Sequence, residues 1–193
     1  MSQGQTLASY IDEDIFGVEK MIYVLKVDVI SFIQMNEIRQ AVITAYISYL
    51  YKLVKDQEWK LMIAFMDPSR TFHDPKSRNV VGRVQYIVKA LNQKDNVYIM
   101  DPLGARQPHD VWKGIVNAGI KQFNAEKGKG LCRSSTWIML SGAPKQADGK
   151  MCGYCVMRYT KVICENSSLA FRTKYARSGK ENEFYTQMKL DKV

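Results

Sequence analysis

The sequence predicts an α+β protein with a single domain, and three observations lead to this prediction. Apolar residues recur at helical spacing in four segments, short apolar runs bounded by turn residues lie among them, and one helical segment is apolar on most of its surface. The chain has 193 residues, of which 46% are hydrophobic and 24% charged, which suits one globular core. We expect residues 1–18 to form a flexible N-terminal segment and residues 19–193 to form the domain.

The first predicted helix, over residues 38–54, is expected to be the buried central helix of the fold. Asn36 precedes it as a candidate N-cap, and apolar residues surround most of its circumference. Its expected inner face consists of Val42, Tyr46, Tyr49, Leu50 and Leu53, widened by Ile43, Ile47 and Val54.

The remaining elements follow in chain order. Residues 61–65 are expected to form a short buried strand or the end of a helix. A second helix is predicted from near Pro75 to Leu91, with a stripe formed by Val80, Val81, Val84, Ile87, Val88 and Leu91. Residues 97–100 and 137–140 are predicted strands, separated by a helix that begins near Asp110. The last predicted helix covers residues 151–164.

The charge pattern favours acidic partners without indicating nucleic acid. Lys and Arg outnumber Asp and Glu by 28 to 19, but the basic residues are scattered along the chain. No apolar stretch reaches about 18 residues, and the N-terminus lacks the features of a signal peptide. We therefore expect an intracellular protein, nuclear or cytoplasmic, with no membrane partner. Its four cysteines are expected to be reduced: Cys132, Cys152, Cys155 and Cys164.

Residues 146–155 carry the strongest chemical signal, because Cys152 lies in the first turn of a predicted helix directly after an Asp-Gly turn. Backbone N–H groups at a helix N-terminus stabilise an anion by about 0.3 to 1 kcal/mol, so they favour the thiolate. The alternative is that Cys152 is a core residue on an apolar helical stripe.

Two further interpretations of the cysteines remain open. Cys152 and Cys155 have the C-x-x-C spacing of a dithiol redox site, but the sequence predicts that the βαβ unit required upstream of such a site is missing. A zinc site would need two more ligands at irregular spacing, from Cys132, Cys164, His73 and His109. We expect no metal and no cofactor.

Two polar residues can complete a site around Cys152. Gln146 lies six residues before it, so its amide and the Cys152 backbone N–H can together form an oxyanion hole. Asp101 follows the predicted strand over residues 97–100, where a cleft is expected. The alternatives are simple solvation for Gln146 and, for Asp101, a turn in which it bonds its own backbone.

Asp101, Gln146 and the Cys152-Gly153 pair, in this order, resemble the site of the ubiquitin-like-protein (SUMO-type) cysteine protease family. The resemblance extends from residue 16 to about 190 and is closest to the branch associated with plant transposable elements. Its other matching segments are residues 16–19, 22–25, 46–51, 65–69, 97–104, 109–113 and 152–159. It implies a papain-like fold, in which a central helix bearing the nucleophile packs on a small mixed sheet.

The resemblance also implies the chemistry. Cys152 is then the nucleophile, Asp101 orients the base, and Gln146 donates to the oxyanion. Such an enzyme cleaves after the C-terminal glycines of a ubiquitin-like protein or removes that protein from lysine side chains. The implied partner is therefore a SUMO-type ubiquitin-like protein or its conjugates.

One residue of the family site is missing from this sequence. The family's base is a His followed by Trp about seventeen residues before the Asp, and that position falls near Val84 in a helical pattern. His73 lies in a polar turn and His109 follows Asp101, so neither matches. We predict that no imidazole lies within about 2.6 to 3.2 Å of the Cys152 sulfur and that catalysis is impaired. A non-catalytic module that binds ubiquitin-like proteins and a C-x-x-C thiol-disulfide protein are the alternatives.

Overall fold

The computed structural model describes residues 6–57, 63–67, 70, 79–91, 96–103, 110–128, 135–165 and 171–175. Their elements, in chain order, are β1 (Thr6–Ile11), α1 (Glu13–Phe16), β2 (Lys20–Leu25), α2 (Lys26–Ile33), α3 (Gln40–Val54), α5 (Val80–Ala90), β3 (Asn96–Ile99), α6 (Asp110–Glu126), β4 (Thr136–Met139), α7 (Cys152–Cys164) and α8 (Phe171–Tyr175). The protein is thus mixed α and β, as predicted at this level. No helix among the described residues has both the length and the apolar character needed to cross a membrane.

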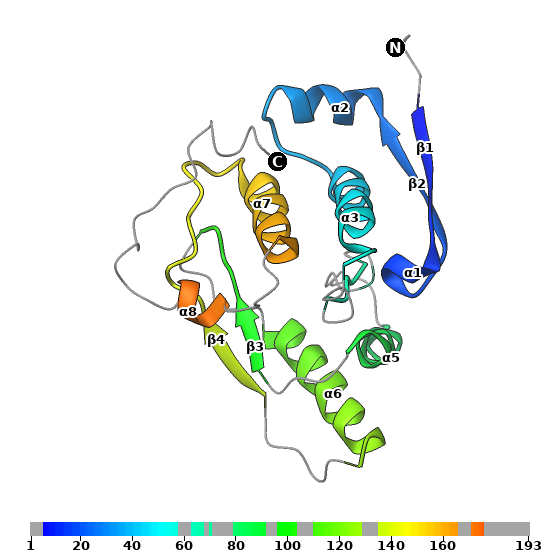
Figure 1. The fold of residues 1–193 in the computed structure, drawn as a ribbon, viewed down its shortest axis with the longest axis vertical. Helices are drawn as coiled ribbons and strands as arrows, with labels where there is room; N and C mark the ends of the chain where they lie inside the picture. The colour runs from blue at the N-terminus through cyan, green and yellow to red at the C-terminus, as the bar shows by residue number, and fades with distance from the viewer. Residues whose placement is uncertain are drawn as a thin grey trace.

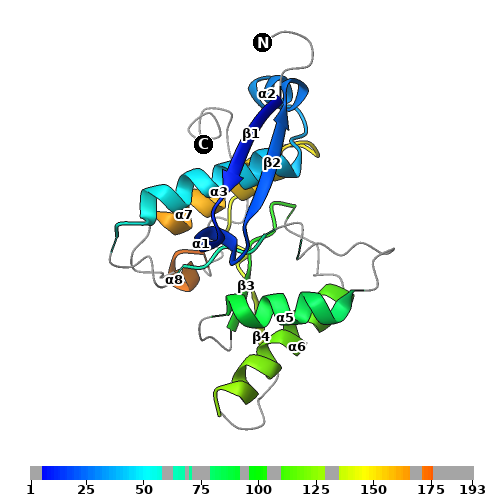
Figure 2. The ribbon, with the colours of Figure 1, turned by 90° about the vertical axis from the view of Figure 1, so that its right-hand side faces the viewer.

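The N-terminal part of the chain is an antiparallel ribbon of β1 and β2 that crosses α3, which β2 contacts (Figures 1 and 2). Ile11 and Ile22 point into a core cluster with Ile15 and Phe16 of α1 and Ile47 of α3. The Asp12 side chain starts α1 by accepting a hydrogen bond from the Asp14 N–H at 2.9 Å. Residues 6–16, which were expected to belong to a loose segment, instead form β1 and α1: pairing with β2 holds β1, and Ile11, Ile15 and Phe16 enter the core.

Helices α3 and α7 lie side by side at the centre of the molecule, as Figures 1 and 2 both show. The buried face of α3 consists of Thr44, Ile47, Ser48, Leu50 and Val54. Tyr49 and Leu53, which were assigned to the inner face, are 53% and 50% exposed. The N-cap is Arg39 rather than Asn36, and it makes no side-chain capping bond.

The β3–α6–β4 segment is a parallel βαβ unit, in which Asn96–Ile99 pairs with Thr136–Met139. Both strands and the helix that begins at Asp110 are confirmed within one residue of their predicted positions. This unit directly precedes the segment of Cys152, so the statement that a βαβ unit is lacking upstream is wrong. A parallel strand pair requires a crossover connection, which α6 provides.

Helix α5 packs on α6 at the far end of the molecule from α2 (Figure 1). It begins at Val80, where the Asn79 side chain accepts a hydrogen bond from the Gly82 N–H at 2.9 Å. The predicted start near Pro75 lies outside the described residues. Val80 and Val81 belong to the predicted stripe but are exposed. Residues 63–65 form neither a strand nor a helix, and residues 61 and 62 are not described.

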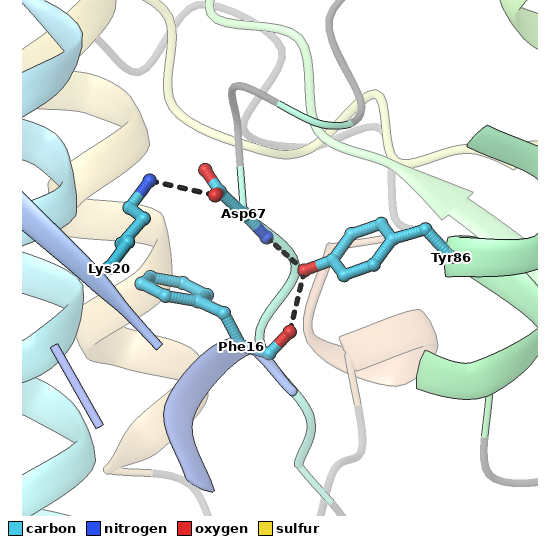
Figure 3. A network of polar contacts seen from close by, with 4 residues as sticks. All are labelled: Phe16, Lys20, Asp67 and Tyr86. Carbon is cyan, nitrogen blue, oxygen red and sulfur yellow. Dashed lines mark hydrogen bonds and ion pairs between the residues drawn. The ribbon is translucent and has the colours of Figure 1, made fainter. Parts of the chain in front are cut away.

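A buried polar network joins the N-terminal ribbon to α5 (Figure 3). The Lys20 ammonium lies 2.7 Å from the Asp67 carboxylate, which is only 1% exposed. The Tyr86 hydroxyl accepts from the Asp67 N–H at 2.7 Å and donates to the Phe16 carbonyl at 3.0 Å. Three segments distant in sequence are thereby fixed at one point.

Candidate functional site

Cys152 is the first residue of α7 and is half-buried. The turn before it is organised by Asp148, whose Oδ1 accepts hydrogen bonds from the N–H of Lys150 at 2.8 Å and of Met151 at 3.2 Å. The Cys152 sulfur lies 4.0 Å from the Gly149 carbonyl oxygen. The N–H groups of the first turn of the helix were expected to point at the sulfur; the two amides that Asp148 binds belong to the turn before α7 and do not test that expectation.

Cys155 lies one helical turn further on and is completely buried. Burial is the main reason that its pKa rises to about 12, with smaller contributions from Cys152 and Asp148. Cys164, buried at the other end of α7, has its pKa raised to about 11 for the same main reason. All three described cysteines are free thiols. Dithiol exchange requires a reactive thiolate at the attacking cysteine and not at the buried one, so the C-x-x-C interpretation stays a prediction.

Gln146 is buried in the same turn, with 6% of its surface exposed. Its backbone N–H donates to the Pro102 carbonyl at 2.8 Å, and its side-chain Nε2 donates to the Asp148 carbonyl oxygen. Its Oε1 atom is buried and has no hydrogen-bond partner among the described residues. The candidate oxyanion donor is therefore held on its own turn in this structure.

Asp101 lies beyond the carboxyl end of β3. The next residue in the same turn, Pro102, accepts the hydrogen bond from the Gln146 N–H. Its Oδ1 accepts a hydrogen bond from the Leu103 N–H at 3.0 Å, which is the local turn considered as its alternative role. Parallel strands end at the same edge of a sheet, so the turns after β3 and β4 meet there. The fold thus brings the segments of Asp101, Gln146 and Cys152 to one end of the β3–β4 sheet.

Both histidines, His73 and His109, lie outside the described residues, as does Cys132. The prediction that no imidazole reaches the Cys152 sulfur stays a prediction. The position at which the family has its His-Trp pair, near Val84, lies inside α5 and not in a strand. Among the described residues, no group of three or more His, Cys, Asp or Glu side chains forms a metal-binding cluster.

Sequence reasoning missed the residue that anchors the start of α7. Tyr154 is buried, and its hydroxyl donates to the carbonyls of Phe32 at 2.9 Å and Ser31 at 3.3 Å. Its ring stacks on the Phe32 ring with 5.7 Å between the centroids, and burial raises the pKa of its phenol. The available signal was an aromatic residue beside Cys152, because a buried tyrosine requires a hydrogen-bond partner.

Gly153 allows the segment before α3 to approach α7 closely. A Cβ atom at Gly153 would overlap Ile38 Cγ1 and would lie 2.7 Å from Ile38 Cδ1. We expect Gly153→Ala to lower the free energy of unfolding by about 1 kcal/mol, because overpacking costs about 1 to 3 kcal/mol and the gain in helix propensity is at most about 1 kcal/mol. Urea unfolding measures the change.

Gly114→Ala in α6 is the matched control, because nothing lies within 4 Å of a Cβ atom placed there. This helical substitution should raise the free energy of unfolding by about 0.5 to 1 kcal/mol. An equal gain for both variants would show that Ile38 does not press on Gly153.

Comparison with known proteins assigns no family to this arrangement: no family model, no curated protein sequence and no solved structure matches the chain. The chemistry rests on the residues themselves. A half-buried thiol begins a helix, a buried amide lies six residues earlier, and a carboxylate lies in the adjoining turn. These groups are suited to nucleophilic attack on a carbonyl carbon, provided that a base is available.

Proposed function

We propose that the chain is the domain of a cysteine-type peptidase or isopeptidase that acts on SUMO-type ubiquitin-like proteins or their conjugates, with impaired catalysis. The observation that carries the proposal is the hydrogen bond from the Gln146 N–H to the Pro102 carbonyl at 2.8 Å. It joins the turn of Gln146 to that of Asp101, while Cys152 begins the helix that follows. The family resemblance requires Asp101, Gln146 and Cys152 to form one site, and adjacent turns for Asp101 and Gln146 support that requirement. The packing of α7 beside a small parallel sheet suits a papain-like fold.

In the proposed reaction, the Cys152 thiolate attacks the carbonyl carbon of the C-terminal glycine of the ubiquitin-like protein. The carbon–nitrogen bond to the leaving amine breaks, the amine takes up a proton, and the resulting thioester is hydrolysed by water. Gln146 Nε2 would stabilise the negative oxygen of each tetrahedral intermediate. Asp101 would orient an imidazole that takes and returns the proton. Because neither histidine matches the family's His-Trp motif, we expect acylation to be slow.

The test is labelling of Cys152 by a SUMO-type protein that carries a C-terminal electrophile, measured at pH 6 and pH 9. We expect slow labelling that is faster at pH 9 than at pH 6, because the thiolate and not the thiol is the nucleophile. Cys152→Ser should remove the labelling, and His73→Ala should leave it unchanged. Fast labelling at pH 6 that is lost in His73→Ala would contradict the impairment and make His73 the base.

A non-catalytic module that binds ubiquitin-like proteins is the second candidate, because Asp148 holds both the Gln146 amide and the amides before Cys152. A pull-down of SUMO-type proteins with the Cys152→Ser variant, beside a peptidase assay on a C-terminal fusion, distinguishes the two. Binding without cleavage would favour the module. Absence of both at high protein concentration would contradict both candidates. We propose a nuclear or cytoplasmic location for either.

A further inference from the structure

The turn before α7 contains a carboxylate at the place where a thiol protease needs positive potential. Asp148 Oδ1 binds the N–H groups of Lys150 and Met151, which precede Cys152 directly. The backbone carbonyl of the same residue accepts the Gln146 Nε2 donor. Asp148 therefore binds the two amides before Cys152 with its side chain and the candidate oxyanion donor with its backbone carbonyl.

Gln146 provides an independent sign that this arrangement changes when a ligand binds. Its side chain is 6% exposed, and its Oε1 atom is buried without a hydrogen-bond partner among the described residues. A buried acceptor without a partner is rare in folded proteins and is often found where a ligand or a rearrangement later satisfies it. The Gln146 amide is thus only half satisfied in this structure.

We propose that Asp148 is a positioning residue that holds the Cys152 site in a closed resting arrangement, opposing the thiolate with its charge and holding the Gln146 amide on the turn. Its role in catalysis rests on the function proposed above. A substrate carbonyl would take the Gln146 Nε2 donor from the Asp148 carbonyl, and the turn of residues 146–151 would rearrange. The helix N-terminus favours an anion at Cys152, whereas the Asp148 carboxylate disfavours it, so removal of the carboxylate charge should make the thiol more reactive.

Among the described residues, the charged side chains of the segments that meet near the start of α7 are Lys145 and Lys150 in the same turn, Glu37 and Arg39 before α3, and Asp101 after β3. Arg39 Nε lies 3.3 Å from the Asp28 carboxylate, and Asp101 accepts from the Leu103 N–H. Lys150 is exposed and its charge opposes that of Asp148. The Asp148 carboxylate is bound to the amides directly before Cys152. Removal of its charge should therefore change the reactivity of the Cys152 thiol more than removal of any of these other charges.

The experiment is alkylation of Cys152 by iodoacetamide, followed by mass spectrometry that separates the four cysteines. Asp148→Asn keeps the side-chain oxygen that accepts from the two amides and removes the charge. We expect about three-fold faster alkylation than in the wild type at pH 7 and low salt, a modest effect because the carboxylate is exposed. In 1 M salt, where the Debye length is about 3 Å, the difference should shrink.

Asp12→Asn is the matched control, because the Asp12 carboxylate likewise accepts a hydrogen bond from the backbone N–H two residues further on. It should leave the alkylation rate unchanged. Asp148→Ala removes both the charge and the acceptor of the two amides, so it should speed alkylation and also lower the melting temperature. An Asp148→Asn rate equal to or below that of the wild type would overturn the inference, with folding of each variant verified by circular dichroism.

The same variants separate this inference from the proposed function. If Asp148→Asn speeds alkylation while no variant is labelled by the electrophilic SUMO-type protein, the effect on the thiol stands and the proposed function fails. If that protein labels the wild type and the variant equally while alkylation is unchanged, the proposed function stands and the inference about Asp148 fails.

Discussion

Replacement of Ile11 by alanine is expected to lower the free energy of unfolding by about 2 to 5 kcal/mol, the range observed when isoleucine is truncated in a protein core. The Ile11 side chain is 0% exposed and packs with Ile15, Phe16, Ile22 and Ile47. These residues come from α1, β2 and α3, so collapse of the cavity would require several elements to move together. Urea unfolding followed by circular dichroism measures the change.

Leu7→Ala is the control for this prediction, because Leu7 lies four residues earlier on the same face of β1. Its side chain is 55% exposed, so the change should be within about 1 kcal/mol. If Ile11→Ala were as mild as Leu7→Ala, the N-terminal segment would be the loose one that the sequence suggested, and the core described here would be wrong.

Lys20→Met is expected to lower the free energy of unfolding by about 3 kcal/mol, at the lower end of the range for removal of one partner from a buried ion pair. The substitution leaves the Asp67 carboxylate, which is 1% exposed, without the ammonium that lies 2.7 Å from it. The Lys20 ammonium also lies 5.6 Å from the centroid of the Phe16 ring, so methionine keeps the apolar stem of the side chain but loses both contacts of the charge. The decrease in the free energy of unfolding should therefore come mainly from removal of the Lys20 positive charge.

Two further variants test that cause. Lys121→Met changes an exposed lysine of α6 and should alter the free energy of unfolding by no more than about 0.5 kcal/mol. Lys20→Met combined with Asp67→Leu removes both charges, so it should recover much of the loss. A double variant less stable than Lys20→Met alone would show that Asp67 acts chiefly through its other contacts and not through the ion pair.

Local sequence signals predicted the second half of the fold well. The apolar spacing of α5, α6 and α7 and the short runs of β3 and β4 are properties of neighbouring residues, so they can be recognised without knowledge of their partners. The Asp-Gly turn likewise indicated that Cys152 begins a helix. Tertiary contacts reinforce these elements without changing their type.

The N-terminal ribbon and α2 were not predicted, because their local signals conflict. Ser9 interrupts the apolar alternation of β1 between Leu7 and Ile11. The alternating start of α2 resembles a strand, yet Asp28 makes it a helix by accepting a hydrogen bond from the Leu25 N–H at 2.9 Å. The antiparallel pairing of β1 with β2 and their contact with α3 are nonlocal, so they are not visible in a single window of sequence.

The sequence by itself determined the candidate residues of the site, because a thiol at a helix start, a glutamine six residues earlier and an aspartate after a strand are all local features. Only the tertiary structure decided how they are arranged. The parallel pairing of β3 with β4 brings the turns of Asp101 and Gln146 together. The free hydrogen-bonding groups of the turn decided that Asp148, and not the Cys152 sulfur, takes the amides of Lys150 and Met151. A charged carboxylate is a much stronger acceptor than a thiol, so it takes the free amides of the turn that precedes the helix.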